Sequence, residues 1–452
     1  MLMKQVKISG YNRSLELTIE KLIYGGDGLA RLPADEKGRG KAAFVPFTLT
    51  GERVEAAVRE EKPGFVRAQL SRIVQASAER IDARCPYFQR CGGCHYQHAG
   101  HSPQLKIKAD ILKENLRRVA KMEWISELKV HASPPWNYRN RTRLQIRGGA
   151  DFLLGYLKSG SNEVVGVEEC PISSPLLNRA IAALWKLGRE GKIAAEIREI
   201  ELFADHDDQR LKLELYGDPR DRKSRIHAGE VLMEALRPAL PEVVSAHVFV
   251  QTAGADRGGA LSVAHEPDWS WGEDFSYRTK ARPLRVSGGS FFQVNRFLVD
   301  ELVETVTRGR SGDVALDLYA GVGLFTAALG QSFRHIVAVE SSQSSVRDLQ
   351  YNSPENVKVV RSTVDEYLEA KSGKIRLDLV VADPPRAGLG DRVVRGLVKL
   401  GAARLIYVSC DPATLARDLG SLVAGGYRVE QMHLMDLFPQ TYHIETVVEL
   451  VR

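Results

Sequence analysis

The sequence has no run of about 18 apolar residues, which is the length that a bilayer-spanning helix requires. Its first ten residues also lack the apolar segment of a secretory signal. These two absences favour a soluble, cytoplasmic protein without a membrane partner. A strong excess of one charge is missing too, because 63 Lys and Arg residues stand against 57 Asp and Glu residues, a net charge of +6. This mild basic balance permits a polyanionic partner but does not require one.

Cysteine is scarce, with five residues in a chain of 452. Cys410 stands alone in the second half, and three of the other four form a C-x5-C-x2-C cluster. An odd count with such a cluster suits a metal site plus one free thiol better than disulfides in a reducing cytosol. Four thiolates fit either an iron–sulfur cluster or structural zinc, and the candidate ligands are Cys85, Cys91, Cys94 and Cys170.

The N-terminal segment from Leu15 to Leu70 reads as short strands separated by turns, including a glycine-rich turn at 24–28. This pattern predicts a small five-stranded barrel. Residues 103–121 follow as a basic amphipathic helix. On the next predicted strand, three arginines share one face, and we favour phosphate over internal ion pairing as their partner; they are Arg139, Arg141 and Arg143.

The C-terminal part alternates short apolar strands with helical segments, which predicts a doubly wound parallel sheet. Two final strands, at 431–437 and 446–451, follow without a long helix between them and should form a hairpin. Asn295 is expected to cap a helix over 296–307. The five predicted parallel strands lie at 314–318, 335–340, 357–360, 377–383 and 405–408.

A glycine turn follows the first of these strands, at Asp317–Leu324. The dinucleotide fingerprint needs a third glycine at position 326, where this chain has Thr326, so hydride chemistry is disfavoured. Glu340 ends the second strand, where a carboxylate can accept hydrogen bonds from two ribose hydroxyls. This combination suits S-adenosylmethionine, which has a ribose but no pyrophosphate.

Cys410 lies where an apolar strand ends and a helical segment begins. Asp411 is suited to cap that helix, and Pro412 to its first position. The positive end of the helix dipole should favour the thiolate, which is the nucleophilic form of cysteine. An isolated cysteine in this position is more often a small apolar residue at a strand end, so Cys410 alone does not establish a nucleophile.

Two further strand ends carry acidic residues. Asp383 is followed by two prolines and Arg386, whereas methyltransferases acting on exocyclic amines follow a similar Asp-Pro-Pro with an aromatic residue. Glu445 starts the last strand, on the side of the sheet where Cys410 lies if the hairpin forms.

Together these residues resemble the RNA (uracil-5-)-methyltransferase family, specifically its iron–sulfur branch that acts on 23S rRNA and carries a TRAM domain. The likeness covers most of the chain. Its motifs are the glycine-rich N-terminal turn, the four cysteines, Tyr138–Arg141, Phe291–Asn295, Asp317–Phe325, Asp383–Arg386, Ser409–Pro412 and His443–Thr446. Some members have Asn where this chain has Leu324 and Thr363.

The resemblance implies a class I, Rossmann-like α/β methyltransferase domain, an N-terminal OB-like TRAM barrel that binds RNA, and a central α+β iron–sulfur domain. We expect these domains at 285–452, 1–76 and 77–284, with helix 103–121 able to pack on the catalytic domain. The resemblance also implies that Cys410 is the nucleophile and Glu445 the base. Gln293, Tyr319, Glu340 and Asp383 would contact S-adenosylmethionine, and Cys85, Cys91, Cys94 and Cys170 would hold a [4Fe-4S] cluster.

Uracil chemistry gives an independent reason for these roles. Carbon 5 of uracil is too weak a nucleophile to attack a sulfonium methyl, so a thiolate must first add to carbon 6. A base must then remove the proton from carbon 5. The target base must also leave any helical stack, which costs least in a single-stranded loop. The resemblance implies that the RNA is 23S rRNA, and we expect the enzyme to be a monomer.

Three alternatives remain open at this stage. The chain could methylate uridine in tRNA, or an exocyclic amine at Asp383–Pro385. It could also be a non-catalytic iron–sulfur protein that binds RNA.

Overall fold

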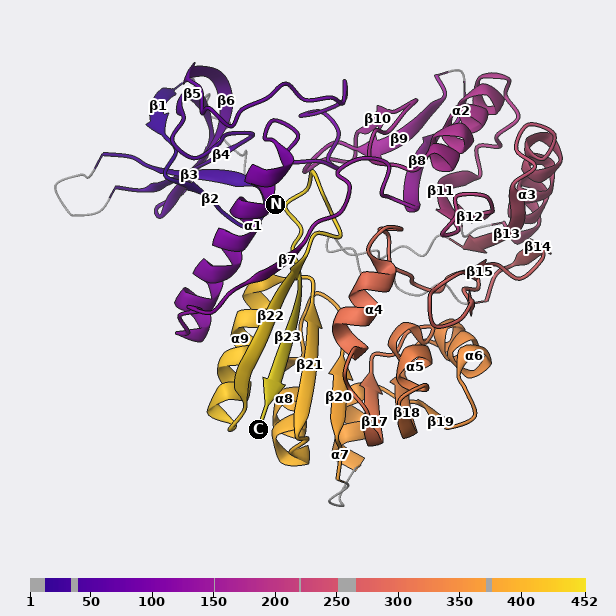
Figure 1. Ribbon diagram of the computed structural model, residues 1–452. Helices are drawn as coiled ribbons and strands as arrows, with labels where there is room; N and C mark the ends of the chain where they lie inside the picture. The colour runs from indigo at the N-terminus through magenta and orange to yellow at the C-terminus, as the bar shows by residue number, and fades with distance from the viewer. Residues whose placement is uncertain (1–12, 34–39, 150, 219–220, 251–265, 371–375) are drawn as a thin grey trace, which may run out of the picture. The chain divides into compact units, whose positions relative to one another are not determined.

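The structure is a computed structural model that describes residues 13–33, 40–149, 151–218, 221–250, 266–370 and 376–452 (Figure 1). It divides into two compact units. The first unit comprises Met1–Gln89, Gly93–Ile111 and Gln440–His443. The second comprises Arg90–Gly92, Leu112–Pro439 and Ile444–Arg452. The domain boundaries expected at residues 76 and 284 stay a prediction.

The first unit is built on a six-stranded sheet of order β1-β5-β6-β4-β3-β2. Alternate residues of β5, such as Val54 and Ala56, are fully buried in its core. Five strands were predicted, and the described residues of this sheet form six. The shortest is the two-residue β2, which pairs with β3 across a turn where Gly25 and Gly26 have positive φ. The strands are β1 (Ser14–Thr18), β2 (Lys21–Leu22), β3 (Asp27–Arg31), β4 (Ala42–Pro46), β5 (Arg53–Glu61) and β6 (Phe65–Gln75).

The helix expected at 103–121 runs as α1 (His101–Asn115), which continues into a π-helical turn, η1 (Leu116–Ala120). From Leu112 onward this segment belongs to the second unit. There Leu112 and Leu116 are fully buried in a core that they share with α9 (Pro412–Ala424) and the C-terminal sheet.

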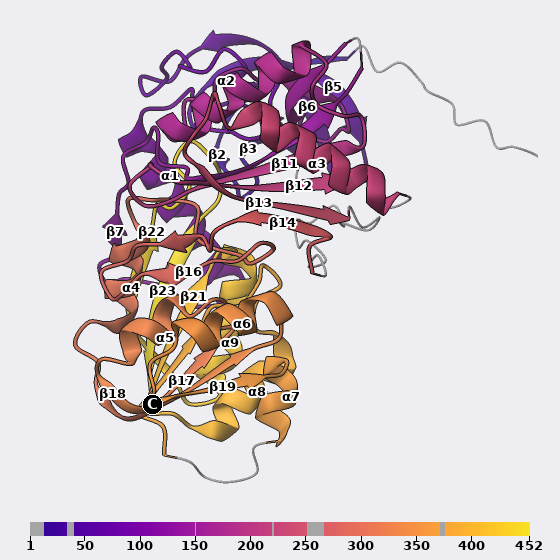
Figure 2. The same cartoon turned by 90° about the vertical axis from the view of Figure 1, so that its right-hand side faces the viewer.

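The second unit contains a seven-stranded sheet of order β10-β9-β8-β11-β12-β13-β14. Helices α2 (Pro175–Arg189) and α3 (Arg222–Leu236) cover one face of it (Figure 2). Its strands are β8 (Arg141–Arg147), β9 (Leu153–Leu157), β10 (Val164–Gly166), β11 (Ile197–Ala204), β12 (Leu211–Gly217), β13 (Val243–Val250) and β14 (Trp269–Gly272). A separate two-stranded sheet follows, made of β15 (Ser276–Tyr277) and β16 (Leu284–Arg285).

The arginines on β8 correct the phosphate expectation. Antiparallel pairing of β8 with β11 places Arg143 opposite Glu201. Arg141 forms a salt bridge with Glu201, and Arg143 pairs with Glu199 at 3.2 Å and with Glu201 at 3.0 Å. Internal ion pairs, and not phosphate, therefore neutralise these two arginines. The carboxylates come from a strand about 60 residues further along the chain.

The second sheet of this unit has eight strands in the order β19-β18-β17-β20-β21-β23-β22-β7. The five predicted parallel strands are confirmed, and so is the hairpin, because β23 pairs antiparallel with β22 and with β21. The strands are β7 (Lys129–His131), β17 (Gly312–Leu318), β18 (Phe333–Glu340), β19 (Val357–Arg361), β20 (Leu379–Ala382), β21 (Arg404–Ser409), β22 (Arg428–Met435) and β23 (Glu445–Val451). The short edge strand β7 was not predicted.

Helices pack on both faces of this sheet, and its central strands are therefore apolar on both sides. Along β21, Leu405 and Tyr407 enter one core, whereas Ile406 and Val408 enter the other. The helices are α4 (Val299–Thr307), α5 (Leu324–Leu329), α6 (Gln343–Asn352), α7 (Val364–Ala370), α8 (Gly390–Leu400) and α9.

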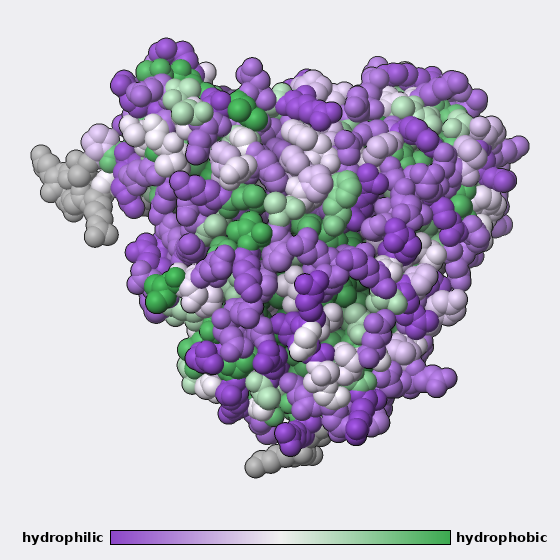
Figure 3. All heavy atoms as spheres, in the orientation of Figure 1, coloured by the Kyte–Doolittle hydropathy of each residue, from purple (hydrophilic) through white to green (hydrophobic). Residues whose placement is uncertain are grey.

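The face of the molecule in Figure 3 carries mostly hydrophilic residues, with apolar ones in small, separate areas. None of the helices in the described parts of the chain is long and apolar enough to cross a membrane.

Candidate active site

Four parallel strands of the eight-stranded sheet, β17, β18, β20 and β21, end at one edge, which we call the carboxyl edge. Glu340 is the last residue of β18, and Tyr319, Asp383 and Cys410 directly follow the other three strands. Strand β23 runs the opposite way and begins at this edge with Glu445. Ser409 pairs with Thr446, so the same register continued by one residue sets Cys410 opposite Glu445. The fold thus gathers five predicted site residues at one edge.

Cys410 precedes helix α9, whose start is as predicted. The Asp411 carboxylate accepts hydrogen bonds from the Ala413 and Thr414 amides at 3.0 and 2.9 Å, and Pro412 takes the first position. The expectation of a favoured thiolate is wrong. Burial, followed by the carboxylates of Glu445 and Asp383, raises the pKa of the Cys410 thiol to about 12. Burial and the two neighbouring carboxylates disfavour the thiolate more than the positive end of the helix dipole favours it.

Two carboxyl groups at this edge, those of Glu445 and Asp383, also have raised pKa values. Glu445 is only 5% exposed, and burial and then Asp383 raise its pKa well above the usual range. Burial and Asp317 raise the pKa of Asp383 to about 7. The opposing positive charge comes from Arg386. Such a cluster can accept and release protons near neutral pH.

The loop that carries Arg386 is fastened to the start of α9. The Thr414 hydroxyl donates to the Arg386 carbonyl oxygen at 3.2 Å, and Arg417 donates to the Ala387 carbonyl oxygen at 2.8 Å. Asp383 and Cys410 therefore lie on neighbouring strand ends whose following segments are bonded to each other.

Glu340 is held in place by backbone amides. Its carboxylate accepts hydrogen bonds from Gly321 at 2.9 Å, Ser341 at 2.8 Å and Ser342 at 2.7 Å. Tyr319 starts the glycine turn with a φ of 61°, a left-handed conformation that is uncommon for a tyrosine. The turn and Glu340 thus form one bonded unit beside the end of β17.

Asp317 is a site residue that sequence reasoning did not single out. Its side chain is fully buried, and its Oδ2 accepts a hydrogen bond from Thr326. Burial raises its pKa to about 7, against the effect of that bond. Its buried Oδ1 has no hydrogen-bond partner among the described residues. An unsatisfied buried oxygen at this edge suits a ligand that brings a donor or a positive charge.

Gln293 is nearly buried, in the loop between β16 and α4, where Phe291 is 67% exposed. The helix after this loop starts at Val299 and not at 296. Asn295 does not cap α4, because its Oδ1 accepts the Phe297 amide at 3.1 Å within the turn that precedes the helix. Its Nδ2 donates to the Ser133 hydroxyl at 2.9 Å and to the Leu437 carbonyl oxygen at 3.1 Å. Ser133 and Leu437 are distant in sequence, so the capping pattern alone could not reveal these two bonds.

The four cysteines predicted as cluster ligands divide between the units. Cys85 and Cys94 belong to the first unit, and Cys91 and Cys170 to the second. Burial, then Cys170 and Cys91, raise the pKa of the Tyr156 hydroxyl, so this pair acts on one buried group. The described residues contain no group of three or more His, Cys, Asp or Glu side chains arranged to hold a metal ion.

The strand order, the glycine turn after the first strand and the acidic residue ending the second define the class of the protein. They are the features of a methyltransferase that uses S-adenosylmethionine. The fold agrees with that of a tRNA (uracil-54, C5)-methyltransferase from Pyrococcus abyssi, solved in complex with S-adenosyl-L-homocysteine. The TM-score is 0.73 at 23% identity, covering 97% of this chain and 100% of that one.

Residues 100–452 match the model of the tRNA (Uracil-5-)-methyltransferase family, and residues 12–71 match the TRAM domain. The chain belongs to this methyltransferase family. It is 33% identical over 447 residues to an RNA methyltransferase of Aquifex aeolicus, covering 97% of this chain and 99% of the relative. It is 31% identical over 449 residues to a 23S rRNA (uracil(1939)-C(5))-methyltransferase of Pseudomonas entomophila, covering 95% and 92%.

Proposed function

We propose that this protein transfers a methyl group from S-adenosylmethionine to carbon 5 of a uridine in 23S rRNA. The observation that carries the proposal is the meeting of Cys410 and Glu445 at adjacent ends of β21 and β23. One supplies a nucleophile and the other a base, next to the acidic residues expected to hold the methyl donor.

Cys410 acts first in the proposed reaction. Its sulfur bonds to carbon 6 of the uracil, and the electron pair of the C5–C6 double bond moves onto carbon 5 and oxygen 4. The thiol proton must leave before this attack. Asp383, with a pKa of about 7, is the neighbouring carboxylate that can take it at neutral pH.

Glu445 acts second. Once carbon 5 has bonded to the methyl group, it still carries its original proton. The Glu445 carboxylate removes that proton, the C5–C6 double bond re-forms, and the Cys410 sulfur leaves carbon 6. Its raised pKa makes the ionised form of Glu445 a stronger base than an exposed glutamate.

Gln293, Tyr319, Glu340 and Asp383 are the proposed contacts of S-adenosylmethionine, which supplies the methyl group on a cationic sulfur. The unpartnered Oδ1 of Asp317 and the oriented carboxylate of Glu340 support this assignment. Buried acidic groups favour a positively charged ligand.

The TRAM domain supports an RNA substrate. The relatives named as 23S rRNA enzymes support ribosomal RNA over transfer RNA. The target base must leave any helical stack to reach Cys410, which costs least in a single-stranded loop.

We also propose that Cys85, Cys91, Cys94 and Cys170 hold a [4Fe-4S] cluster. The support is the chemistry of the donor set, since four cysteine thiolates are the usual ligands of such clusters. No step of methyl transfer passes through it. Protein purified without oxygen should be brown and contain about four iron atoms per chain. Colourless protein containing zinc would refute this assignment.

Replacing Cys410 by alanine tests the covalent mechanism. We expect Cys410→Ala to abolish formation of 5-methyluridine, measured by digesting the RNA to nucleosides and analysing them by mass spectrometry. Retained 5-methyluridine would refute the role of the thiol. A methylated exocyclic amine in the digest would favour amine chemistry at Asp383, and methylation of tRNA alone would exclude the ribosomal substrate. RNA binding without any turnover would indicate a non-catalytic protein.

A further inference from the structure

Helix α6 follows Glu340 and carries a buried carboxylate that the proposed chemistry does not use. Asp348 is fully buried, and within the described parts of the chain it accepts four hydrogen bonds, all from one distant segment, residues 285–290. Oδ1 accepts from the Ser287 hydroxyl at 2.6 Å and from Arg285 Nε at 2.9 Å. Oδ2 accepts from the Ser287 amide and from the Ser290 hydroxyl, both at 2.8 Å. A carboxylate has about four acceptor positions, so this one is fully used.

Asn352 lies one helical turn further along α6, on the same face. Its Oδ1 accepts from the Arg285 amide at 2.8 Å. Its Nδ2 donates to the Arg285 carbonyl oxygen at 2.9 Å and to the Val322 carbonyl oxygen at 2.8 Å. Val322 belongs to the glycine turn after β17, so one side chain joins that turn to the 285–290 segment.

The 285–290 segment is also held from β8 and β12. Lys212, fully buried, donates to the carbonyl oxygens of Val286 at 3.1 Å and Ser287 at 2.9 Å. Arg141 donates to the Ser290 carbonyl oxygen at 2.8 Å. The segment contains Gly288 and Gly289, which give the backbone freedom that these contacts must restrict.

The two segments that α6 joins both lead to proposed contacts of S-adenosylmethionine. The 285–290 segment leads to Gln293, and the glycine turn includes Gly321, whose amide bonds Glu340. We propose that Asp348 and Asn352 are positioning residues for S-adenosylmethionine. They fix the Gln293 loop and the glycine turn in the conformation that binds the donor, so the cost of ordering both falls on folding and not on binding. This inference rests on the proposed function.

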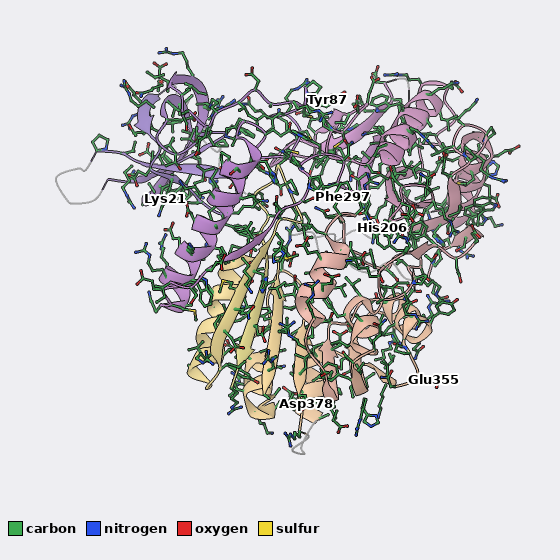
Figure 4. The ribbon with its side chains drawn as sticks, in the orientation of Figure 1. Lys21, Tyr87, His206, Phe297, Glu355 and Asp378 are labelled. Atoms are coloured by element: carbon green, nitrogen blue, oxygen red, sulfur yellow. The ribbon has the colours of Figure 1, made fainter. Side chains whose placement is uncertain are left out.

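The test compares each of these two residues with a matched control residue at the opposite edge of the sheet. Asn356 Nδ2 also donates to two carbonyl oxygens, of Gly330 at 3.0 Å and Phe333 at 2.7 Å, and it directly precedes β19. The Asp378 carboxylate accepts two amides, of Asp313 at 2.7 Å and Val314 at 3.1 Å, and directly precedes β20. Figure 4 labels Asp378 and Glu355, the neighbour of Asn356, in the lower part of the view.

We expect Asp348→Asn and Asn352→Ala to weaken binding of S-adenosyl-L-homocysteine roughly tenfold, measured by calorimetry on the full chain. The KM for S-adenosylmethionine should rise by a similar factor, whereas kcat at saturating donor and the KM for RNA should change less than about twofold. Asp378→Asn and Asn356→Ala should leave donor binding unchanged even where they lower the melting temperature equally. Ser290→Ala removes a single bond to Asp348 and should weaken binding about threefold if Asp348→Asn does not fold.

The inference would be overturned if all three variants bound S-adenosyl-L-homocysteine within twofold of the parent affinity; these variants are Asp348→Asn, Asn352→Ala and Ser290→Ala. An equal loss in Asp378→Asn and Asn356→Ala would also overturn it, because the effect would then be general destabilisation. A parent protein that binds S-adenosyl-L-homocysteine but forms no 5-methyluridine would refute the proposed function separately, since the binding comparison needs no RNA.

Discussion

Buried charges are arranged differently in the two sheets of the second unit. In the seven-stranded sheet, Lys212 Nζ lies 2.9 Å from Glu214 Oε1, and Arg141 and Arg143 form salt bridges with Glu201. Burial alone would raise the pKa of Glu214, but Lys212 and Arg141 lower it well below its usual range. At the carboxyl edge of the eight-stranded sheet, burial and neighbouring carboxylates act together and raise the pKa values of Glu445, Asp383 and Asp317.

The comparison separates a structural role from a chemical one. Opposite charges that satisfy each other hold strands and loops together and have no reason to titrate near neutral pH. Carboxyl groups that are buried close together have raised pKa values, so they can exchange protons near neutral pH, but their proximity lowers stability. The same contrast occurs along β23. Glu449 pairs with Arg310 at 2.7 Å and with Arg404, whereas burial and the Asp383 carboxylate raise the pKa of Glu445.

The largest expected effect separates these two glutamates. In Glu445→Gln the amide cannot remove the carbon 5 proton, so turnover should fall at least about a thousandfold. The methylated RNA should remain bonded to Cys410 and migrate with the protein on a denaturing gel. Glu449→Gln neutralises a paired carboxylate on the same strand and should reduce stability without trapping RNA. Trapped RNA in both variants, or in neither, would remove the distinction.

A smaller effect is expected when a satisfied charge is broken. Glu214→Gln leaves Lys212 buried beside an uncharged amide and should lower the free energy of unfolding by roughly 3–5 kcal/mol. Replacing both partners by apolar residues, as in Lys212→Met with Glu214→Leu, should restore part of that loss. Urea denaturation of the parent, single and double variants measures both, and a double variant no better than the single one would argue against pairing as the cause.

Removing a buried carboxyl group that lies beside other acidic groups should instead raise the free energy of unfolding. The pKa of Asp383 rises from 3.8 in the unfolded chain to about 7 in the folded one, so the native state holds an extra proton between these pH values. Stability therefore falls as pH rises through this window. Asp383→Asn should raise the free energy of unfolding by roughly 2–4 kcal/mol at pH 8 and by little at pH 4, while reducing methyl transfer. An equal change at both pH values would contradict the assigned titration.

Local patterns explain which features the sequence could predict. The strand before Cys410, the Asp411 cap and Pro412 at the first helical position depend on neighbouring residues, and the structure has all three. The parallel strands were visible as apolar runs because each packs against helices on both sides.

Long-range partners explain what the sequence could not predict. The carboxylates that neutralise Arg141 and Arg143 lie on β11 and become neighbours only through strand pairing. The high pKa of Cys410 arises from burial and then from the carboxylates of Glu445 and Asp383, which three separate strands bring together. No sequence pattern singled out Asp348, because its partners are about 60 residues earlier in the chain.

The smallest expected effect concerns pH. A thiol activated by a helix terminus would be ionised near neutrality, and the rate would then level off by about pH 8. With the pKa of Cys410 raised to about 12 and that of Asp383 near 7, the thiol proton must pass to an ionised Asp383 before the attack. The rate of the parent at saturating RNA and S-adenosylmethionine should therefore rise by up to about tenfold per unit below pH 7 and level off above about pH 8. Single-turnover methyl transfer by Asp383→Asn decides between the two explanations. Without the base its slower rate should keep rising to pH 9, whereas a plateau below pH 8 in this variant would mean that the thiol is activated despite its acidic neighbours.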